Sequence, residues 1–128
     1  MIKSKIFLQA PRRSGKTTWI FERALKHSQL FKNQKQIKIA IVKARMRYTS
    51  QARLKTCTEN GILLYKVESL IWMKGLDGNY AKEMWIFIDD YDCISKSDIE
   101  DLMYCLEESE ISFNICCIST NTQRITEL

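Results

Sequence analysis

The sequence predicts an α/β domain, a three-layer α/β/α sandwich built around a mainly parallel sheet. Short apolar or β-branched segments alternate along the chain with segments of helical periodicity, and this alternation is typical of parallel sheets with right-handed crossovers. The chain has 128 residues, of which 45% are apolar. This is enough for one domain with its own core, so we assign residues 1–128 to a single domain.

Local patterns predict the first two strands and the first two helices. Residues 4–10 (SKIFLQA) read as a short apolar strand, and residues 16–31 follow with apolar side chains at helical spacing. Residues 36–44 (QIKIAIVKA) are a β-branched strand that ends in charged residues. Residues 46–60 are expected to form a helix, which the Asn-Gly pair at 60–61 would end.

The middle of the chain predicts two further strands. Residues 62–67 (ILLYKV) are a short strand, and residues 68–75 give one or two helical turns. Residues 76–83 form a loop with an Asp-Gly turn. Residues 84–89 (MWIFID) are continuously apolar up to the final acid, which is the pattern of a strand covered on both faces.

The last predicted helix and strand follow this buried segment. Ser97 and Glu100 have the spacing of a capping box, and apolar side chains behind them share one helical face. Residues 112–120 (SFNICCIST) read as a second buried strand, in which Cys116 and Cys117 would point to opposite faces. Five cysteines without C-x-x-C spacing favour buried, reduced thiols over a disulfide framework or a zinc site.

The charge of the chain is unevenly distributed. Residues 1–55 hold fifteen Lys or Arg and one acid, a net charge of +14, whereas residues 56–128 hold five and fourteen, a net charge of −9. Such a basic half favours a polyanionic partner, of which nucleic acid is the usual candidate. The alternative is a solvated basic face that folds against the acidic half. No membrane-spanning run or signal peptide is present in the sequence, so we expect a cytoplasmic protein, in the host cytoplasm if viral, without a membrane partner.

The segment that begins at Ala10, A-P-R-R-S-G-K-T, matches the P-loop pattern G-x-x-x-x-G-K-[ST] with Ala in the first position. In such a loop, backbone N–H groups and a helix N-terminus converge on a phosphate, and Gly15 permits the close approach. Lys16 would lie between the β- and γ-phosphates, and Thr17 would offer a hydroxyl to Mg²⁺. The predicted nucleotide-binding residues are Ala10, Pro11, Arg12, Arg13, Ser14, Gly15, Lys16, Thr17 and Thr18.

Acids and polar residues follow two later strands. In WIFIDDYD, Asp89 would hold Mg²⁺ through water, and Asp90 would polarise the attacking water, with Asp92 as its rival. The strand within 112–120 leads to a candidate γ-phosphate sensor if it lies beside the first strand. The predicted sensor residues are Ser119, Thr120 and Asn121.

Together APRRSGKTT, IFIDDYD and CCISTN resemble the additional-strand branch of P-loop NTPases. Within that branch the chain looks most like a terminase large-subunit ATPase domain, or the first motor domain of superfamily 1 and 2 helicases. The resemblance implies a P-loop NTPase fold, the cofactors ATP and Mg²⁺, and catalytic roles for Lys16 and Asp90. These families usually carry Glu where Asp90 stands. They also carry further domains, so the resemblance implies a homo-oligomer or a larger protein partner.

A basic strip follows the second predicted strand. In helicases the matching region contacts the backbone of single-stranded DNA, so the resemblance favours DNA over RNA. An extended chain would present alternate basic side chains on one side, with Tyr48 available for stacking. The predicted nucleic-acid-binding residues are Lys43, Arg45, Arg47, Arg53 and Lys55.

The function predicted from the sequence is therefore an ATP-binding and ATP-hydrolysing protein that acts on or with nucleic acid. Water would attack the γ-phosphate while Lys16 and Mg²⁺ absorb the charge. Arg124, Arg12, Arg13 or a residue supplied in trans could serve as an arginine finger. Two alternatives stay open at this point: a nucleoside or nucleotide kinase, and a non-catalytic module that binds nucleotide or nucleic acid and regulates a partner.

Overall fold

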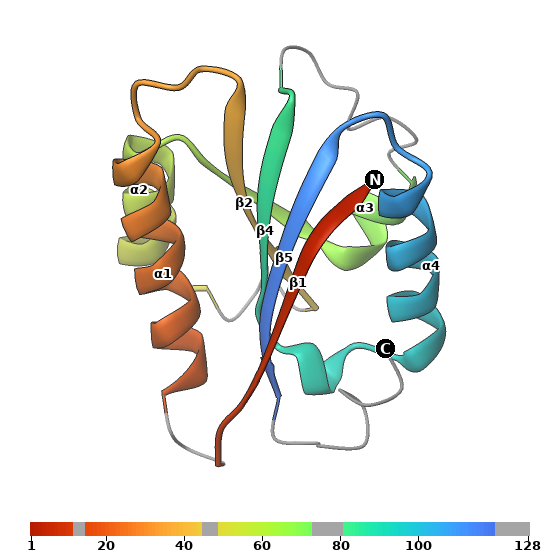
Figure 1. Ribbon diagram of the computed structural model, residues 1–128. Helices are drawn as coiled ribbons and strands as arrows, with labels where there is room; N and C mark the ends of the chain where they lie inside the picture. Colours follow the sequence, from red (N-terminus) through yellow and green to blue (C-terminus); the bar gives the residue numbers. More distant parts are fainter. Residues whose placement is uncertain (12–14, 45–48, 73–80, 120–128) are drawn as a thin grey trace.

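The computed structural model describes residues 1–11, 15–44, 49–72 and 81–119. Within these ranges the chain forms one five-stranded sheet in the order β1-β5-β4-β2-β3 (Figure 1). Every strand pair in it is parallel. The strands are β1 (Ile2–Gln9), β2 (Ile37–Lys43), β3 (Ile62–Lys66), β4 (Glu83–Ile88) and β5 (Ser112–Ser119).

Helices cover both faces of the sheet, so the predicted α/β architecture with a parallel sheet is confirmed (Figure 1). One face carries the first two helices, and the other face carries the remaining ones. No helix within the described ranges is long and apolar enough to cross a bilayer. The helices are α1 (Lys16–Leu30), α2 (Gln51–Glu59), α3 (Val67–Trp72) and α4 (Lys96–Glu107), and η2 (Tyr91–Cys93) is a 3₁₀ turn.

Helix starts differ from the sequence prediction at two positions, and a side-chain cap explains each. Helix α2 begins at Gln51 rather than residue 46, because the Ser50 side chain accepts a hydrogen bond from the backbone of Arg53. Helix α4 is capped by Ser95, which accepts from the Asp98 N–H at 3.2 Å, and not by the predicted Ser97. Serine is a favoured cap at either position, so the sequence alone does not discriminate between neighbouring serines. The predicted loop at 76–83 lies mostly outside the described residues.

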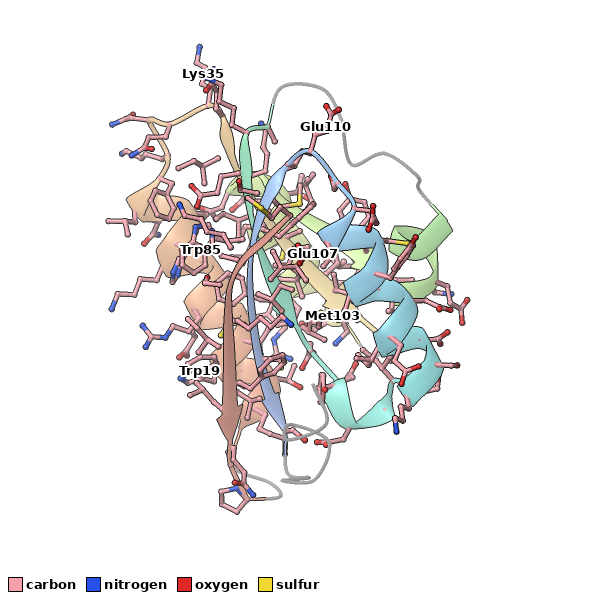
Figure 2. All side chains as sticks on the ribbon, turned by 45° about the vertical axis from the view of Figure 1, so that its right-hand side comes forward. Trp19, Lys35, Trp85, Met103, Glu107 and Glu110 are labelled. Atoms are coloured by element: carbon pink, nitrogen blue, oxygen red, sulfur yellow. The ribbon has the colours of Figure 1, made fainter. Side chains whose placement is uncertain are left out.

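Two apolar cores lie on the two faces of the sheet. The α4 side buries alternate residues of the central strands together with Tyr91, Leu102 and Leu106. The α1 side buries the other alternate residues together with Ile20 and Ala24. The single histidine, His27, is half-buried beside this second core, and its ring centroid lies 4.6 Å from that of Trp85, which is labelled in Figure 2. Both faces of β4 and β5 are covered, as their continuous apolar sequences predicted.

Polar side chains link three adjacent strands near their amino ends. Asn114 on β5 accepts a hydrogen bond from Ser4 on β1 at 2.5 Å and donates one to Glu83 on β4 at 2.7 Å. Lys3 completes the chain with an ion pair to Glu83 at 3.1 Å. The hydrogen bond from Asn114, and then that from Lys3, lower the pKa of Glu83. Each contact joins one particular residue on a strand to one on its neighbour. The contacts therefore favour a single register of β1, β5 and β4.

None of the five cysteines is part of a disulfide. As expected, the two adjacent ones face opposite cores. Burial raises the pKa of Cys116 to about 11 and raises the pKa of Cys117 further. Because the thiolate is the reactive form, both side chains should be inert in the native protein. The expectation of buried thiols is confirmed for Cys57, Cys116 and Cys117, but it is wrong for Cys93, which is exposed, and Cys105 is half-buried.

We therefore expect maleimide at neutral pH to label Cys93 in the folded protein and to spare Cys57, Cys116 and Cys117. Peptide mass mapping of labelled protein, before and after addition of urea, would measure this. The three buried thiols should become reactive only in urea. Equal labelling of Cys93 and Cys117 without urea would show that the strand β5 is not buried as described.

Candidate functional site

The carboxyl ends of the parallel strands meet at one edge of the sheet, where ligands bind in many α/β proteins. Lys43 ends β2, Asp89 follows β4 directly, and Thr17 lies in the first turn of α1. The structure therefore brings together Thr17 and Asp89, which the sequence analysis had predicted as one site. It adds Lys43, which had been placed in the nucleic-acid strip.

Asp89 is held by two donors in the interior of this edge. The Thr17 hydroxyl donates to Oδ1 at 3.0 Å, and the Lys43 ammonium donates to Oδ2 at 2.6 Å. Lys43 and Asp89 side chains are each only 2% exposed. A buried charge of either sign requires a partner, because its transfer out of water costs several kcal/mol. Lys43 and Asp89 therefore neutralise each other inside the fold.

Asp90 contributes a second carboxylate to the same cation. Its Oδ2 lies 3.4 Å from the Lys43 ammonium, and its side chain is 24% exposed. Its backbone has φ of 58°, in the left-handed region, which is uncommon for a residue other than glycine. This conformation turns the chain from β4 into η2. Asp92, the predicted rival of Asp90, instead accepts a hydrogen bond from Ser119 at the end of β5.

The arrangement around Asp89 does not fit a magnesium ion as it stands. Mg²⁺ requires oxygen ligands in octahedral geometry, and here the ammonium of Lys43 already lies against the carboxylate that would bind it. A metal ion at Asp89 would have to displace Lys43. Binding of ATP and Mg²⁺ at these residues stays a prediction of the sequence.

The P-loop-like segment is described only in part. Gly15 has φ of 77°, which explains the need for glycine before α1. Ala10 donates its N–H to the Ser119 carbonyl at 3.1 Å, so the predicted sensor strand does lie beside the first strand. Lys16 begins α1. The other predicted residues of this loop and sensor that lie outside the described ranges are Arg12, Arg13, Ser14, Thr120 and Asn121.

The predicted nucleic-acid strip is divided by the structure. Lys43 is buried in its ion pair, so its ammonium does not face solvent. Arg53 is half-buried and donates to the Thr18 hydroxyl, whereas Lys55 is exposed and lies 3.9 Å from Glu59. The sequence did contain a signal for this ion pair. Lys43 ends one apolar strand and Asp89 directly follows another, and the carboxyl ends of parallel strands meet at the same edge of a sheet. The strip residues Arg45 and Arg47, the nearby Tyr48, and the candidate finger Arg124 lie outside the described ranges.

A separate groove of about 250 Å³ runs between α1 and α2. Its apolar lining includes Phe21, Leu25 and Ile62. At its rim the Arg53 guanidinium lies 5.0 Å from the Phe21 ring centroid and donates to Thr18 Oγ1 at 2.9 Å. A second groove of about 360 Å³ follows the other side of α2 along β3. The sequence analysis did not predict either groove. The first joins residues 18–25 to residues 52–62, which are far apart in the chain, whereas the second lies within residues 54–64 and depends on how α2 packs beside β3.

The α1 side of the molecule is basic and the α4 side is acidic. Residues 16–36 and 51–59 carry seven Lys or Arg and two acids, whereas residues 96–110 carry one Lys and six acids. In Figure 2, Lys35 lies on the α1 side of the sheet, and Glu107 lies on the α4 side. The described helices on one face of the sheet are therefore basic overall, and helix α4 on the other face is acidic.

The fold is similar to that of SulA from Pseudomonas aeruginosa. A crystal structure of that protein matches with a TM-score of 0.50, covering 91% of this chain and 99% of that chain, at 10% sequence identity. At this identity the similarity concerns the fold alone. No protein-family model matches the sequence, and no curated protein matches it.

This similarity corrects the predicted function and family. The chain was expected to be a P-loop NTPase, and specifically a terminase-like or helicase-like ATPase that acts on nucleic acid. That prediction is wrong, because the fold matches SulA rather than such an ATPase, and no ATPase, terminase or helicase family model matches the sequence. The kinase alternative relied on the same loop pattern and is withdrawn with it. The eight residues that begin at Ala10 match the P-loop pattern, but a match of this length does not by itself establish the fold or the reaction.

Proposed function

We propose that this chain is a protein-binding module whose α1–α2 groove receives an acidic segment of a protein partner. The observation that carries the proposal is an apolar groove with the Arg53 guanidinium at its rim. Glu22 also lines the groove, and the net basic charge comes from the surrounding helices. Phe21, Leu25 and Ile62 offer apolar contact, and Arg53 lies over Phe21 at the rim. Recognition of this kind needs an apolar anchor together with a charged contact near it.

Arg53 is suited to a carboxylate because its guanidinium is already positioned. The hydrogen bond to Thr18 and the stacking on Phe21 fix its orientation before a partner arrives. A planar guanidinium can bind a carboxylate through two parallel hydrogen bonds. The basic charge of the surrounding layer would attract an acidic partner, and the apolar groove would select a partner with a bulky apolar side chain. The partner we propose is therefore an acidic segment with at least one Phe or Leu.

Fluorescence anisotropy with two labelled peptides of equal negative charge would test the groove. One peptide contains Glu with Leu and Phe, and the other contains Glu with Ser. We expect the apolar acidic peptide to bind at least about tenfold more tightly than the polar one. Arg53→Gln should weaken that binding about tenfold, because it removes the charge and the bidentate contact. Lys35→Gln is the matched control: it removes the same charge from an exposed position outside the groove.

Nucleic acid is the competing partner, and the same assay distinguishes it. Contacts to phosphates would make DNA binding fall steeply with added salt, whereas apolar contacts in the groove persist. A DNA oligonucleotide that binds more tightly than either peptide, with equal loss on Arg53→Gln and Lys35→Gln, would contradict the proposal. Equal affinity for the two peptides would contradict it as well. Circular dichroism of each variant would verify that the fold is retained.

A further inference from the structure

Strand β1 forms one edge of the sheet, on a surface separate from the α1–α2 groove. Within the described ranges it pairs only with β5. Ala10 directs its N–H toward β5, where it donates to Ser119. Adjacent residues of a strand direct their backbone groups to opposite edges, so Lys5 and Phe7 direct theirs away from β5. A row of such groups is a template for pairing with another strand.

The side chains of this edge also leave apolar surface exposed. Phe7 packs toward the α4 side, where its ring centroid lies 6.2 Å from that of Tyr91. Ile6 and Leu8 therefore point to the α1 side, and they are 40% and 38% exposed. Helix α1 packs chiefly over β2, which lies three strands away from this edge strand in the sheet. This edge of the sheet therefore presents both the outward N–H and C=O groups of β1 and two exposed apolar side chains.

We propose that a second copy of this chain pairs with β1 in antiparallel orientation, about a two-fold axis that passes beside Phe7. This register places Ile6 of each copy opposite Leu8 of the other, on one face. The four side chains then form a continuous apolar patch across the junction. Lys5 of each copy lies opposite Gln9 of the other. The interface is self-complementary, as a two-fold homodimer requires.

Charge disfavours the registers whose axis lies nearer the amino end of β1. Side chains directly opposite or diagonal across an antiparallel pair interact, and like charges there are unfavourable. An axis at Lys5 would place the two Lys5 side chains directly opposite each other, and an axis at Ile6 would place them on a diagonal. With the axis at Phe7 they lie four residues apart along the strand, or about 14 Å. Pro11 has no N–H to donate, so pairing ends near it.

Sedimentation velocity over a wide concentration range would test the dimer, with Leu8→Lys as the disruptive variant. The new lysine would lie opposite Ile6 of the second copy, and we expect it to weaken dimerisation at least about tenfold. Leu63→Lys is the matched control, because Leu63 is a leucine on the opposite edge strand, β3, with a similar exposure of 37%. It should leave the dimer unchanged. Thermal unfolding followed by circular dichroism would show that both variants fold.

Amide hydrogen exchange supplies a second readout that does not depend on a variant. The Phe7 amide should exchange more slowly as the protein concentration rises, because pairing with the second copy protects it. Slow exchange of this amide at every concentration would mean that another part of the same chain covers the edge, and it would overturn the proposal. A monomer at all concentrations, or equal weakening by Leu8→Lys and Leu63→Lys, would overturn it too.

Discussion

Lys43→Met should lower the free energy of unfolding by about 3–5 kcal/mol, because it leaves Asp89 as a buried carboxylate without its cation. The size of the effect follows from burial: the Lys43 and Asp89 side chains are each 2% exposed, and their charged atoms are 2.6 Å apart. The Thr17 hydroxyl alone cannot neutralise Asp89. Chemical denaturation in urea, monitored by tryptophan fluorescence, would measure the loss.

Two further variants separate the ion pair from simple loss of packing. Lys55→Met removes a lysine whose ion pair with Glu59 is open to solvent, with side chains 78% and 61% exposed. It should change stability by no more than about 0.5 kcal/mol. The double variant Lys43→Met with Asp89→Asn removes both buried charges and keeps an acceptor for Thr17. It should recover most of the lost stability, and a loss below about 1 kcal/mol for Lys43→Met alone would contradict the buried pair.

Tyr91→Ala is the second variant for which we expect a large effect, a loss of about 3–5 kcal/mol. Among the described residues, Tyr91 has the largest fully buried side chain, and its ring packs beside Phe7 of the edge strand. Truncation would leave a cavity between η2 and β1. The control is Tyr104→Ala on α4, where the tyrosine is 69% exposed. Urea denaturation should show a change of no more than about 0.5 kcal/mol for this control, and equal effects of the two variants would contradict the assigned burial.

Local patterns in the sequence predicted the elements of the fold well. The alternation of apolar runs and helical segments located each strand and helix, because these patterns depend on neighbours within one or two turns. The apolar runs before Asp89 and around Cys116 predicted strands covered on both faces, and both are buried. The caps at Ser50 and Ser95 differed by a few residues, since several polar residues near a helix start can serve.

Long-range pairing is what the sequence could not supply. The sheet order, which leaves β1 at an edge, depends on contacts between segments up to about 110 residues apart. The same holds for Lys43: its charge suggested a solvent-exposed contact, but its place beside β4 turns it inward toward Asp89. The loop pattern at Ala10 led to an ATPase prediction for a similar reason. A short motif reflects only the local chain, whereas the function depends on which residues the rest of the fold places around that motif.

The pairing of β1 with β5 also has a consequence for how the chain folds during synthesis. Of the described strands, β1 is synthesised first and its neighbour β5 last, so these two strands cannot pair until the other three have emerged from the ribosome. All described pairs are parallel, and no hairpin can form early to protect it. Until β5 is made, the unpaired strand exposes three consecutive apolar side chains, those of Ile6, Phe7 and Leu8. The nascent domain is therefore most exposed to aggregation, or to chaperone capture, at its own first strand.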